Sequence, residues 1–238
     1  MNQRAHPTVR PYALALGVIP RRGVTEQLSF LGPAVAQDLA TALLLDTLGA
    51  LSTFPVRHRL VFTDGDDAVT RHSRLPATWR EVAQRGETAN ERLVNAFEDL
   101  VSLGAEAMLV VTADGPMMPL GQMFDGMMWL LPKNRLLVGG NENGGIFALG
   151  AAERVPFLPA IDRPLGLGGS VGDAVSLDTE DYVAGKASEV GLEVQRLPKS
   201  YRVEDMAAFK RLKKDVSEGM FAPQSRKLFE RSDVAALG

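Results

Sequence analysis

Short apolar runs alternate along the chain with stretches in which apolar residues return every three or four positions. The first pattern predicts buried strands, and the second predicts helices with one apolar face. Residues 66–86 and 151–176 show neither pattern and are expected to be irregular. Strands are expected at residues 12–19, 59–63, 107–113, 136–138, 146–149 and 192–197, and helices near residues 33–50, 89–103, 119–131, 178–190 and 203–214.

This alternation of strands and helices predicts an α/β fold, a three-layer sandwich with a mixed, mostly parallel central sheet. The hairpin-like segment 136–149 is expected to supply the antiparallel part. A single domain should span residues 12–214, with a disordered or loosely packed N-terminus over 1–11 and a C-terminal extension over 215–238.

Composition and charge narrow the classes of function. The 238 residues include no cysteine, which excludes disulfides, thiolate metal sites and a cysteine nucleophile. A net charge of −3 provides no general attraction to nucleic acid or to anionic membranes. No apolar run reaches the roughly 20 residues that span a bilayer, and no signal peptide is visible. A cytoplasmic location is expected, while the oligomeric state stays open, a homodimer included.

Asp114 directly follows the apolar run Ala107–Ala113. In open α/β sheets, ligands bind beyond the carboxyl ends of the strands, so a carboxylate at this position suits a binding site. Asp114 could hold a divalent cation, Mg²⁺ or Mn²⁺, that neutralises a diphosphate. Asp-Gly-Pro, the sequence at residues 114–116, is also common in turns. Both interpretations, a ligand-binding carboxylate and a simple turn, stay open.

A second loop, residues 139–145, combines four glycines with three polar side chains. Glycines allow a backbone to approach a ligand closely, and the polar groups could bind sugar hydroxyls or a metal. The alternative is a hairpin turn, because Asn-Gly is the strongest short hairpin signal. The candidate substrate-binding residues are Asn141, Glu142, Asn143, Gly144 and Gly145.

Two further loops carry cations. Arg21, Arg22 and Gly23 follow the first strand, and a planar guanidinium binds two phosphate oxygens at once. Ordinary surface charge explains the two arginines equally well. Gly86 and Arg92 flank the start of a helix, where free backbone amides favour anions.

Taken together, these loops resemble a bacterial family of uncharacterised glycosyltransferase-like proteins with the nucleotide-diphospho-sugar transferase (GT-A) fold, distantly related to 2-phospholactate guanylyltransferases. The similarity extends from about residue 12 to residue 212. The matching pieces are Pro20–Gly23, Gly32–Leu48, Trp79, Gln84–Phe97, Val111–Pro116, Asn143–Gly150, Leu197-Pro198 and Glu204–Met206.

The resemblance implies a transferase that takes a nucleotide sugar or a nucleotide as donor and a small molecule as acceptor, with Asp114 as the catalytic and metal-binding residue. Three segments depart from the family pattern. Thr25–Leu28 stands where the family has Lys-Thr-Arg-Leu, Asn143 where it has Asp, and Lys199–Arg202 where it has Asp-x-Asp-Thr.

These departures remove two cations and several carboxylates. They leave two alternatives to a metal-dependent transferase. One is a catalytically inactive relative that serves as a ligand-binding or scaffold protein. The other is a transferase that works without metal.

Overall fold

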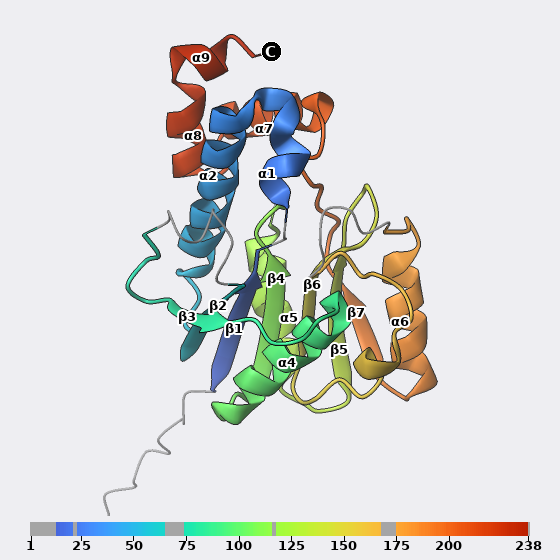
Figure 1. Ribbon diagram of the computed structural model, residues 1–238. Helices are drawn as coiled ribbons and strands as arrows, with labels where there is room; N and C mark the ends of the chain where they lie inside the picture. Colours follow the sequence, from blue (N-terminus) through green and yellow to red (C-terminus); the bar gives the residue numbers. More distant parts are fainter. Residues whose placement is uncertain (1–12, 21–22, 65–73, 116–117, 168–174, 238) are drawn as a thin grey trace, which may run out of the picture.

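The computed structural model describes residues 13–20, 23–64, 74–115, 118–167 and 175–237. These residues form a seven-stranded sheet in the order β3-β2-β1-β4-β6-β5-β7 (Figure 1). Strand β6 runs antiparallel to both of its neighbours, and the other described pairings are parallel. The strands are β1 (Leu14–Ile19), β2 (His58–Thr63), β3 (Arg80–Ala83), β4 (Ala107–Thr112), β5 (Arg135–Gly140), β6 (Ile146–Ala151) and β7 (Glu193–Arg196).

Helices cover both faces of this sheet (Figure 1). One face packs against α2 (Pro33–Leu51), α5 (Leu120–Trp129) and α7 (Met206–Ser217) in a continuous apolar cluster. The other packs against α4 (Ala89–Ser102) and α6 (Thr179–Glu189). The expected three-layer sandwich with a mixed, mostly parallel sheet is therefore confirmed.

The central strand β4 shows why the apolar runs were a reliable signal. All of its residues, Ala107–Thr112, are buried, because β1 and β6 flank it and helices cover both of its faces. A strand covered on both faces needs apolar side chains at every position rather than at alternate ones. The start of α4 has the capping box that the spacing of Thr88 and Glu91 indicates. Thr88 Oγ1 accepts a hydrogen bond from the amide of Glu91, and Glu91 Oε2 accepts one from the amide of Thr88.

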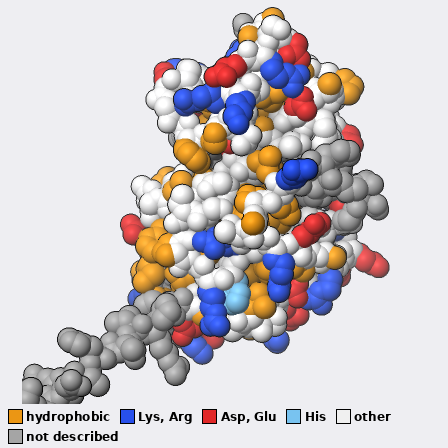
Figure 2. All heavy atoms as spheres, turned by 90° about the vertical axis from the view of Figure 1, so that its left-hand side faces the viewer, with side chains coloured by type: hydrophobic (Ala, Val, Ile, Leu, Met, Phe, Trp, Pro, Cys, Tyr) orange, Lys and Arg blue, Asp and Glu red, His pale blue; other side chains and the backbone are white. Residues whose placement is uncertain are grey.

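Some expectations were wrong. Residues 80–83 form the edge strand β3 inside a stretch expected to be irregular. Residues 24–27, expected to belong to a polar loop over 21–27, form α1 (Val24–Gln27), and the 3₁₀ helix η1 (Leu28–Leu31) follows it. Figure 2 faces the β3 side of the sheet and shows basic side chains beside hydrophobic patches.

The chain after α7 folds back onto the domain. Helix α8 (Pro223–Phe229) lies along α2, and α9 (Ser232–Ala235) follows it at the top of Figure 1. Asp46 of α2 accepts hydrogen bonds from the amides of Gln224 (2.8 Å) and Ser225 (2.9 Å) at the start of α8. The expected boundary at residue 215 falls inside α7.

Among the described residues, α2 is the one helix that is long and apolar enough, by length and composition, to cross a membrane. Most of it, 67%, is buried inside the fold, as in the core helix of an α/β domain.

Loops from all three layers meet at one edge of the sheet, the upper edge in Figure 1. Parallel strands end at the same edge, so the carboxyl ends of β1, β2, β3, β4, β5 and β7 lie there. Because β6 is antiparallel, the turn that joins β5 to β6 lies there too.

Candidate functional site

Asp114 lies at this edge, two residues beyond β4, and only 4% of it is exposed. Together with Pro20, Val24, Leu43 and other residues of β4 and α2, it lines a small crevice of about 10 Å³. The carboxylate is therefore held inside the fold at the mouth of the sheet rather than in bulk solvent.

Residues 199–202 pass directly beside the Asp114 turn. Ser200 pairs with Asn141 in an isolated parallel bridge that continues the β5–β7 pairing beyond the named strands. A Cβ atom placed on Gly115 would lie 3.3 Å from Ser200 Oγ. The ends of β4, β5 and β7 thus meet at Gly115, Asn141 and Ser200.

The 141–145 loop forms the turn between β5 and β6, as the hairpin alternative predicted. Within it, Gly144 donates to the carbonyl of Asn141, and Asn141 donates to that of Gly145. Gly144 and Gly145 have φ angles of 91° and 71°, a region that disfavours any side chain. A Cβ atom on Gly144 would also lie 2.9 Å from the carbonyl of Ser176, so packing within the protein already requires this glycine.

Two polar side chains of this loop are engaged within the protein. Both carboxylate oxygens of Glu142 accept from the guanidinium of Arg211, at 2.6 and 3.0 Å. This interaction is the main reason why the pKa of Glu142 is lowered. Asn143 Oδ1 accepts from the amide of Arg202, and the Asn143 carbonyl accepts from Arg202 Nη2 at 3.2 Å.

Asn141 differs from these two neighbours. It is 2% exposed, and neither the nitrogen nor the oxygen of its side-chain amide has a hydrogen-bond partner among the described residues. Ser200 Oγ is buried in the same way. Since leaving such groups unsatisfied is costly, this pair is the part of the loop region best suited to receive a ligand or water.

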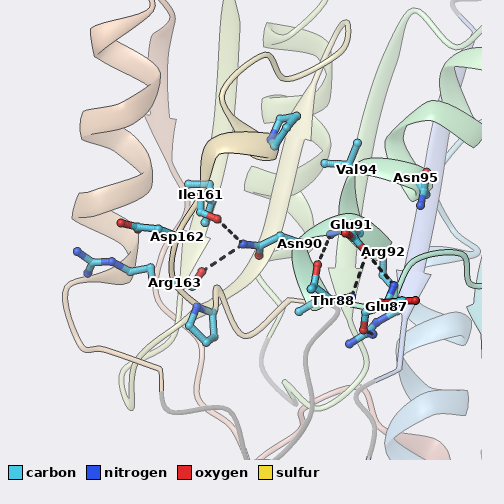
Figure 3. A pocket seen from close by; sticks show the side chains of 13 residues that line it. Glu87, Thr88, Asn90, Glu91, Arg92, Val94, Asn95, Ile161, Asp162 and Arg163 are labelled. Atoms are coloured by element: carbon cyan, nitrogen blue, oxygen red, sulfur yellow. Dashed lines mark hydrogen bonds between the residues drawn. The ribbon is translucent and has the colours of Figure 1, made fainter.

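A cavity of about 730 Å³ lies on the face of the sheet that α4 and α6 cover. One wall is formed by the first turn of α4, which includes Arg92, and by the two residues that precede the helix. The other wall is formed by residues between Pro159 and Pro164 (Figure 3). Asn90 spans the two walls, donating to the carbonyls of Ile161 (3.0 Å) and Arg163 (3.4 Å). Asp114 does not line this cavity.

Gly86 and Arg92 shape the α4 wall. Gly86 has a φ of 114°, and a Cβ atom there would lie 2.7 Å from Glu91 Cβ and 2.9 Å from the amide of Arg92. Arg92 is buried and donates through Nη1 to the carbonyl of Glu87 at 2.7 Å. Gly86 thus allows the chain to close against the first turn of α4.

The opposite wall, formed by residues between Pro159 and Pro164, was not predicted from the sequence to be part of a site. Asp162 and Arg163 point toward α6 in Figure 3. Arg163 stacks on Tyr182 with 3.8 Å between the guanidinium carbon and the ring centroid, and it pairs with Asp178. Tyr182 donates to Asp162 at 2.8 Å and lowers the pKa of that carboxyl. These partners lie up to twenty residues apart, so no local pattern signals the cluster.

The first loop is described only in part. Arg21 and Arg22 lie outside the described residues. Gly23 precedes α1 with a φ of 73°, a left-handed conformation that suits glycine.

The described residues do not fit the donor set of a divalent metal. They contain no group of three or more His, Cys, Asp or Glu side chains that could hold an ion. Two acidic residues lie close to the end of β5. Glu142 accepts a hydrogen bond from Arg211, and the buried Glu180 has its Oε1 3.9 Å from Arg196 Nη1. A cation such as Mg²⁺ prefers several oxygen ligands, which the described residues do not bring together.

Comparison with known proteins agrees with the fold. Residues 47–160 match the model of a family described as "Uncharacterized protein conserved in bacteria (DUF2064)". This match confirms the resemblance to an uncharacterised bacterial family. No curated protein matches the sequence.

The following three are among the solved structures that are similar to the chain. A candidate nucleotide-diphospho-sugar transferase from Desulfovibrio desulfuricans G20 is 17% identical, with a TM-score of 0.71 and 94% of each chain covered. A candidate glucose-1-phosphate thymidylyltransferase from Bacillus anthracis, in complex with sucrose, is 11% identical, with a TM-score of 0.58 and 88% of this chain and 98% of that one covered.

The third is CMP:2-keto-3-deoxy-manno-octonic acid synthetase complexed with CTP, 13% identical with a TM-score of 0.50, covering 86% of this chain and 98% of that one. At these identities the similarity establishes the nucleotide-diphospho-sugar transferase fold and nothing finer. The expected GT-A fold is confirmed.

Proposed function

We propose that this chain, which matches that bacterial family over residues 47–160 and has the fold of nucleotide-diphospho-sugar transferases, is a cytoplasmic transferase with a nucleotide-activated donor. It moves a glycosyl group from a nucleotide sugar, or a nucleotidyl group from a nucleotide, to a small acceptor.

The observation that carries this proposal is the buried carboxylate of Asp114 at the carboxyl end of the central strand β4. Open α/β sheets bind ligands at that edge, and a carboxylate is the group that a ribose or sugar hydroxyl or an acceptor hydroxyl needs as a hydrogen-bond acceptor. Transfer reactions of this class depend mainly on positioning and charge stabilisation, so few side chains suffice.

The cavity beside α4 supplies the volume that the crevice at Asp114 lacks. At about 730 Å³, it lies within the range of roughly 300–1,000 Å³ typical of small-molecule sites. In the proposal the base or sugar of the donor enters between Arg92 and Arg163, while the reacting phosphate lies at the sheet edge between Asp114 and Asn141. The CTP-bound and sucrose-bound neighbours support a nucleotide and a sugar as the ligand classes.

Ligand-dependent thermal unfolding tests the proposal. The purified chain is heated with nucleoside triphosphates and with UDP-, GDP- and CDP-linked sugars, alone and with Mn²⁺. At a concentration of 100 times Kd, a specific ligand stabilises the folded state by about 2.7 kcal/mol, which raises Tm by several degrees. If no ligand at millimolar concentration raises Tm, a nucleotide donor is excluded.

A catalytically inactive relative is the second candidate, and one observation favours it. Glu142 and Asn143, two polar side chains of the β5–β6 loop, already bind Arg211 and Arg202 within the protein. If the chain is a scaffold protein of this kind, we expect it to bind a ligand without turnover. We also expect its cellular role to be retained in the Asp114→Asn variant. Failure of Asp114→Asn to complement a deletion strain argues for the transferase.

A further inference from the structure

A second pocket lies at the same edge of the sheet as Asp114. It has a volume of about 110 Å³ and is enclosed by α2, the start of α5, α7 and the turn that precedes α8. Gly115, directly after Asp114, is part of its wall. Leu43 of α2 lines both this pocket and the crevice that contains Asp114. The α2–α8 pocket, as we call it, therefore adjoins the acid on which the proposed function depends.

Most of the side chains that line the α2–α8 pocket are apolar. Leu43 and Ala50 of α2 and Leu212 of α7 are buried. Met118 and Met220 are half-buried and pack against the same apolar cluster. Methionine side chains are flexible and fit irregular apolar shapes. The wall thus suits an apolar group and can adapt to it.

The acid that lines the α2–α8 pocket is engaged within the protein. Asp46 is 7% exposed, and its two carboxylate oxygens accept hydrogen bonds from the amides of Gln224 and Ser225. Burial raises the pKa of Asp46. A phosphate or carboxylate in the pocket would meet this acid and apolar side chains, which are unfavourable surroundings for an anion.

Phe221 lies at the rim of the α2–α8 pocket. Its side chain belongs to the wall, yet the residue is 63% exposed. Single apolar side chains are common on protein surfaces, but this ring lies where an apolar pocket meets solvent. A ligand in the pocket would cover part of the ring and remove that area from water.

The size and polarity of the α2–α8 pocket decide which part of a substrate can occupy it. Sites for whole small molecules have volumes of roughly 300–1,000 Å³, whereas an apolar cavity of roughly 150 Å³ holds a single benzene ring. A pocket of about 110 Å³ therefore takes only one group of a larger ligand. The base, ribose, phosphates and sugar of a nucleotide donor are polar and would lose hydration against an apolar wall. An apolar group has to come from the acceptor.

We propose that the acceptor carries an apolar group, the size of a short alkyl chain or a single ring, and that this group binds in the α2–α8 pocket. The inference rests on the proposed function. The polar end of the acceptor then lies toward Gly115 and Asp114, while the donor occupies the cavity beside α4. The C-terminal segment, which supplies Met220, Phe221 and Ala222, thereby forms part of the acceptor site.

Methyl NMR of the full chain, labelled with ¹³C at the methionine methyl groups, tests the inference with benzyl alcohol as the probe. The methyl signals of Met118 and Met220 should shift in a saturable manner as benzyl alcohol is added. The signal of Met108, which packs on the opposite face of the sheet, should stay unchanged. Glycerol, a small polar molecule, should shift none of the three signals.

Three variants locate the binding site of the probe. Ala50→Leu fills the pocket and should weaken binding of benzyl alcohol about 10-fold or more, because the new side chain takes the space of the ring. Ala207→Leu, at an exposed position of α7, is the matched control and should bind like wild type. Phe221→Ala changes an exposed side chain, so it decides the matter even if Ala50→Leu does not fold. It should weaken binding about 2- to 10-fold.

The same titration in saturating CTP and in saturating UDP-glucose separates acceptor from donor. We expect benzyl alcohol to bind as tightly with either nucleotide as without it. Displacement of the probe by a nucleotide would assign the pocket to the donor, which overturns the inference and leaves the proposed function standing. Signals that never saturate, or equal binding by wild type, Ala50→Leu and Phe221→Ala, also overturn it. If no nucleotide or nucleotide sugar raises Tm, the proposed function fails, and the acceptor site fails with it.

Discussion

At the scale of single residues, the site combines one buried acid with surface acids that cations already neutralise. Asp114 occupies the end of the central strand, and Glu142, the acid of the neighbouring turn, is bound by Arg211. The two carboxylates therefore have different surroundings. Asp114 is buried beside α1 and α2, whereas Glu142 links the β5–β6 turn to α7.

Asp114→Asn removes the charge and keeps the shape of the side chain. Once a donor and acceptor are identified, this change is expected to lower kcat/KM about 100-fold or more, the usual cost of a lost electrostatic group in a transfer reaction. Steady-state kinetics measures it. Asp125→Asn on the exposed side of α5 is the control and should retain full activity. Full activity of Asp114→Asn would remove this acid from the mechanism.

Glu142→Gln tests the link between the turn and α7. The pKa of Glu142 is lowered, chiefly by its hydrogen bond with Arg211, so its stabilising effect is present above its unfolded pKa and is lost as the pH falls through the folded value. Both side chains are more than 40% exposed, so the effect at neutral pH should be below about 1 kcal/mol.

Urea unfolding of wild type and Glu142→Gln at neutral pH and below about pH 4 measures this difference. The gap between the two proteins should close at the lower pH. A gap that stays constant or widens as the pH falls would show that the Glu142–Arg211 pair does not account for the pKa shift.

The sequence was informative about some of these residues and silent about others. Asp114 could be found because a long apolar run ends just before it. The pairing of Glu142 with Arg211 spans 69 residues, and the contact of Asn143 with Arg202 spans 59, so no local spacing reveals either. A candidate ligand residue therefore cannot be told from a structural one until its long-range partner is known.

At the scale of elements, the turn into α4 forms one wall of the 730 Å³ cavity. Gly86 has a positive φ and lies against Glu91 and Arg92, which both line the cavity. The capping box formed by Thr88 and Glu91 fixes the first turn of the helix beside it. The backbone conformation at Gly86 and the side-chain capping box together therefore set this wall.

Gly86→Ala should destabilise the fold by about 1–3 kcal/mol, because the new Cβ meets atoms 2.7 and 2.9 Å away in a strained conformation. Gly104→Ala is the matched control, with a positive φ of 76° and no atom within 4 Å of the new Cβ. Its cost should be the strain alone, about 1 kcal/mol. Denaturant unfolding compares the two, and an equal loss would mean that close packing at Gly86 is unimportant.

The helices and strands were predicted well where every residue of a strand is buried or where a helix begins with a recognisable cap. Strands β1 and β4 are buried on both faces and α4 carries its capping box, so periodicity and cap agreed. Strand β3 was missed because Arg80-Glu81-Val82-Ala83 is an edge strand with three exposed residues. Charged edge strands avoid pairing with other chains, and the same charges hide them from a search for apolar runs.

At the scale of the whole molecule, the C-terminal segment covers α2 instead of extending freely. Val234 and Leu228 are buried there, and Asp46 binds the first amides of α8. The same segment contributes Met220, Phe221 and Ala222 to a pocket of about 110 Å³ that also includes Gly115, next to Asp114. Docking of the C-terminal helices and the shape of the site are therefore linked.

Asp46→Ala should destabilise the protein by about 1–3 kcal/mol, because the part-buried amide of Gln224 and the buried amide of Ser225 lose their acceptor. Hydrogen exchange at Gln224 and Ser225 should accelerate more than exchange in β4. Asp125→Ala, on the exposed side of α5, should change neither site. Unchanged exchange at the start of α8 in Asp46→Ala would mean that Asp46 does not hold the C-terminal segment.

Whole-molecule architecture followed from the order of elements, since alternating strands and helices admit few other arrangements. The site did not follow in the same way. The 730 Å³ cavity is built from α4 and from Pro159–Pro164, a segment whose sequence suggested only a loop. Cavities between elements depend on how the layers pack, which a linear pattern does not record.

The central claim is that a nucleotide donor binds at the carboxyl edge of the sheet. A crystal of the full chain soaked with a nucleotide sugar or nucleoside triphosphate tests it most directly. We expect density for phosphates between Asp114 and Asn141, with the rest of the ligand reaching into the cavity beside α4. Ligand density elsewhere on the molecule, with this edge closed by protein side chains, would contradict it.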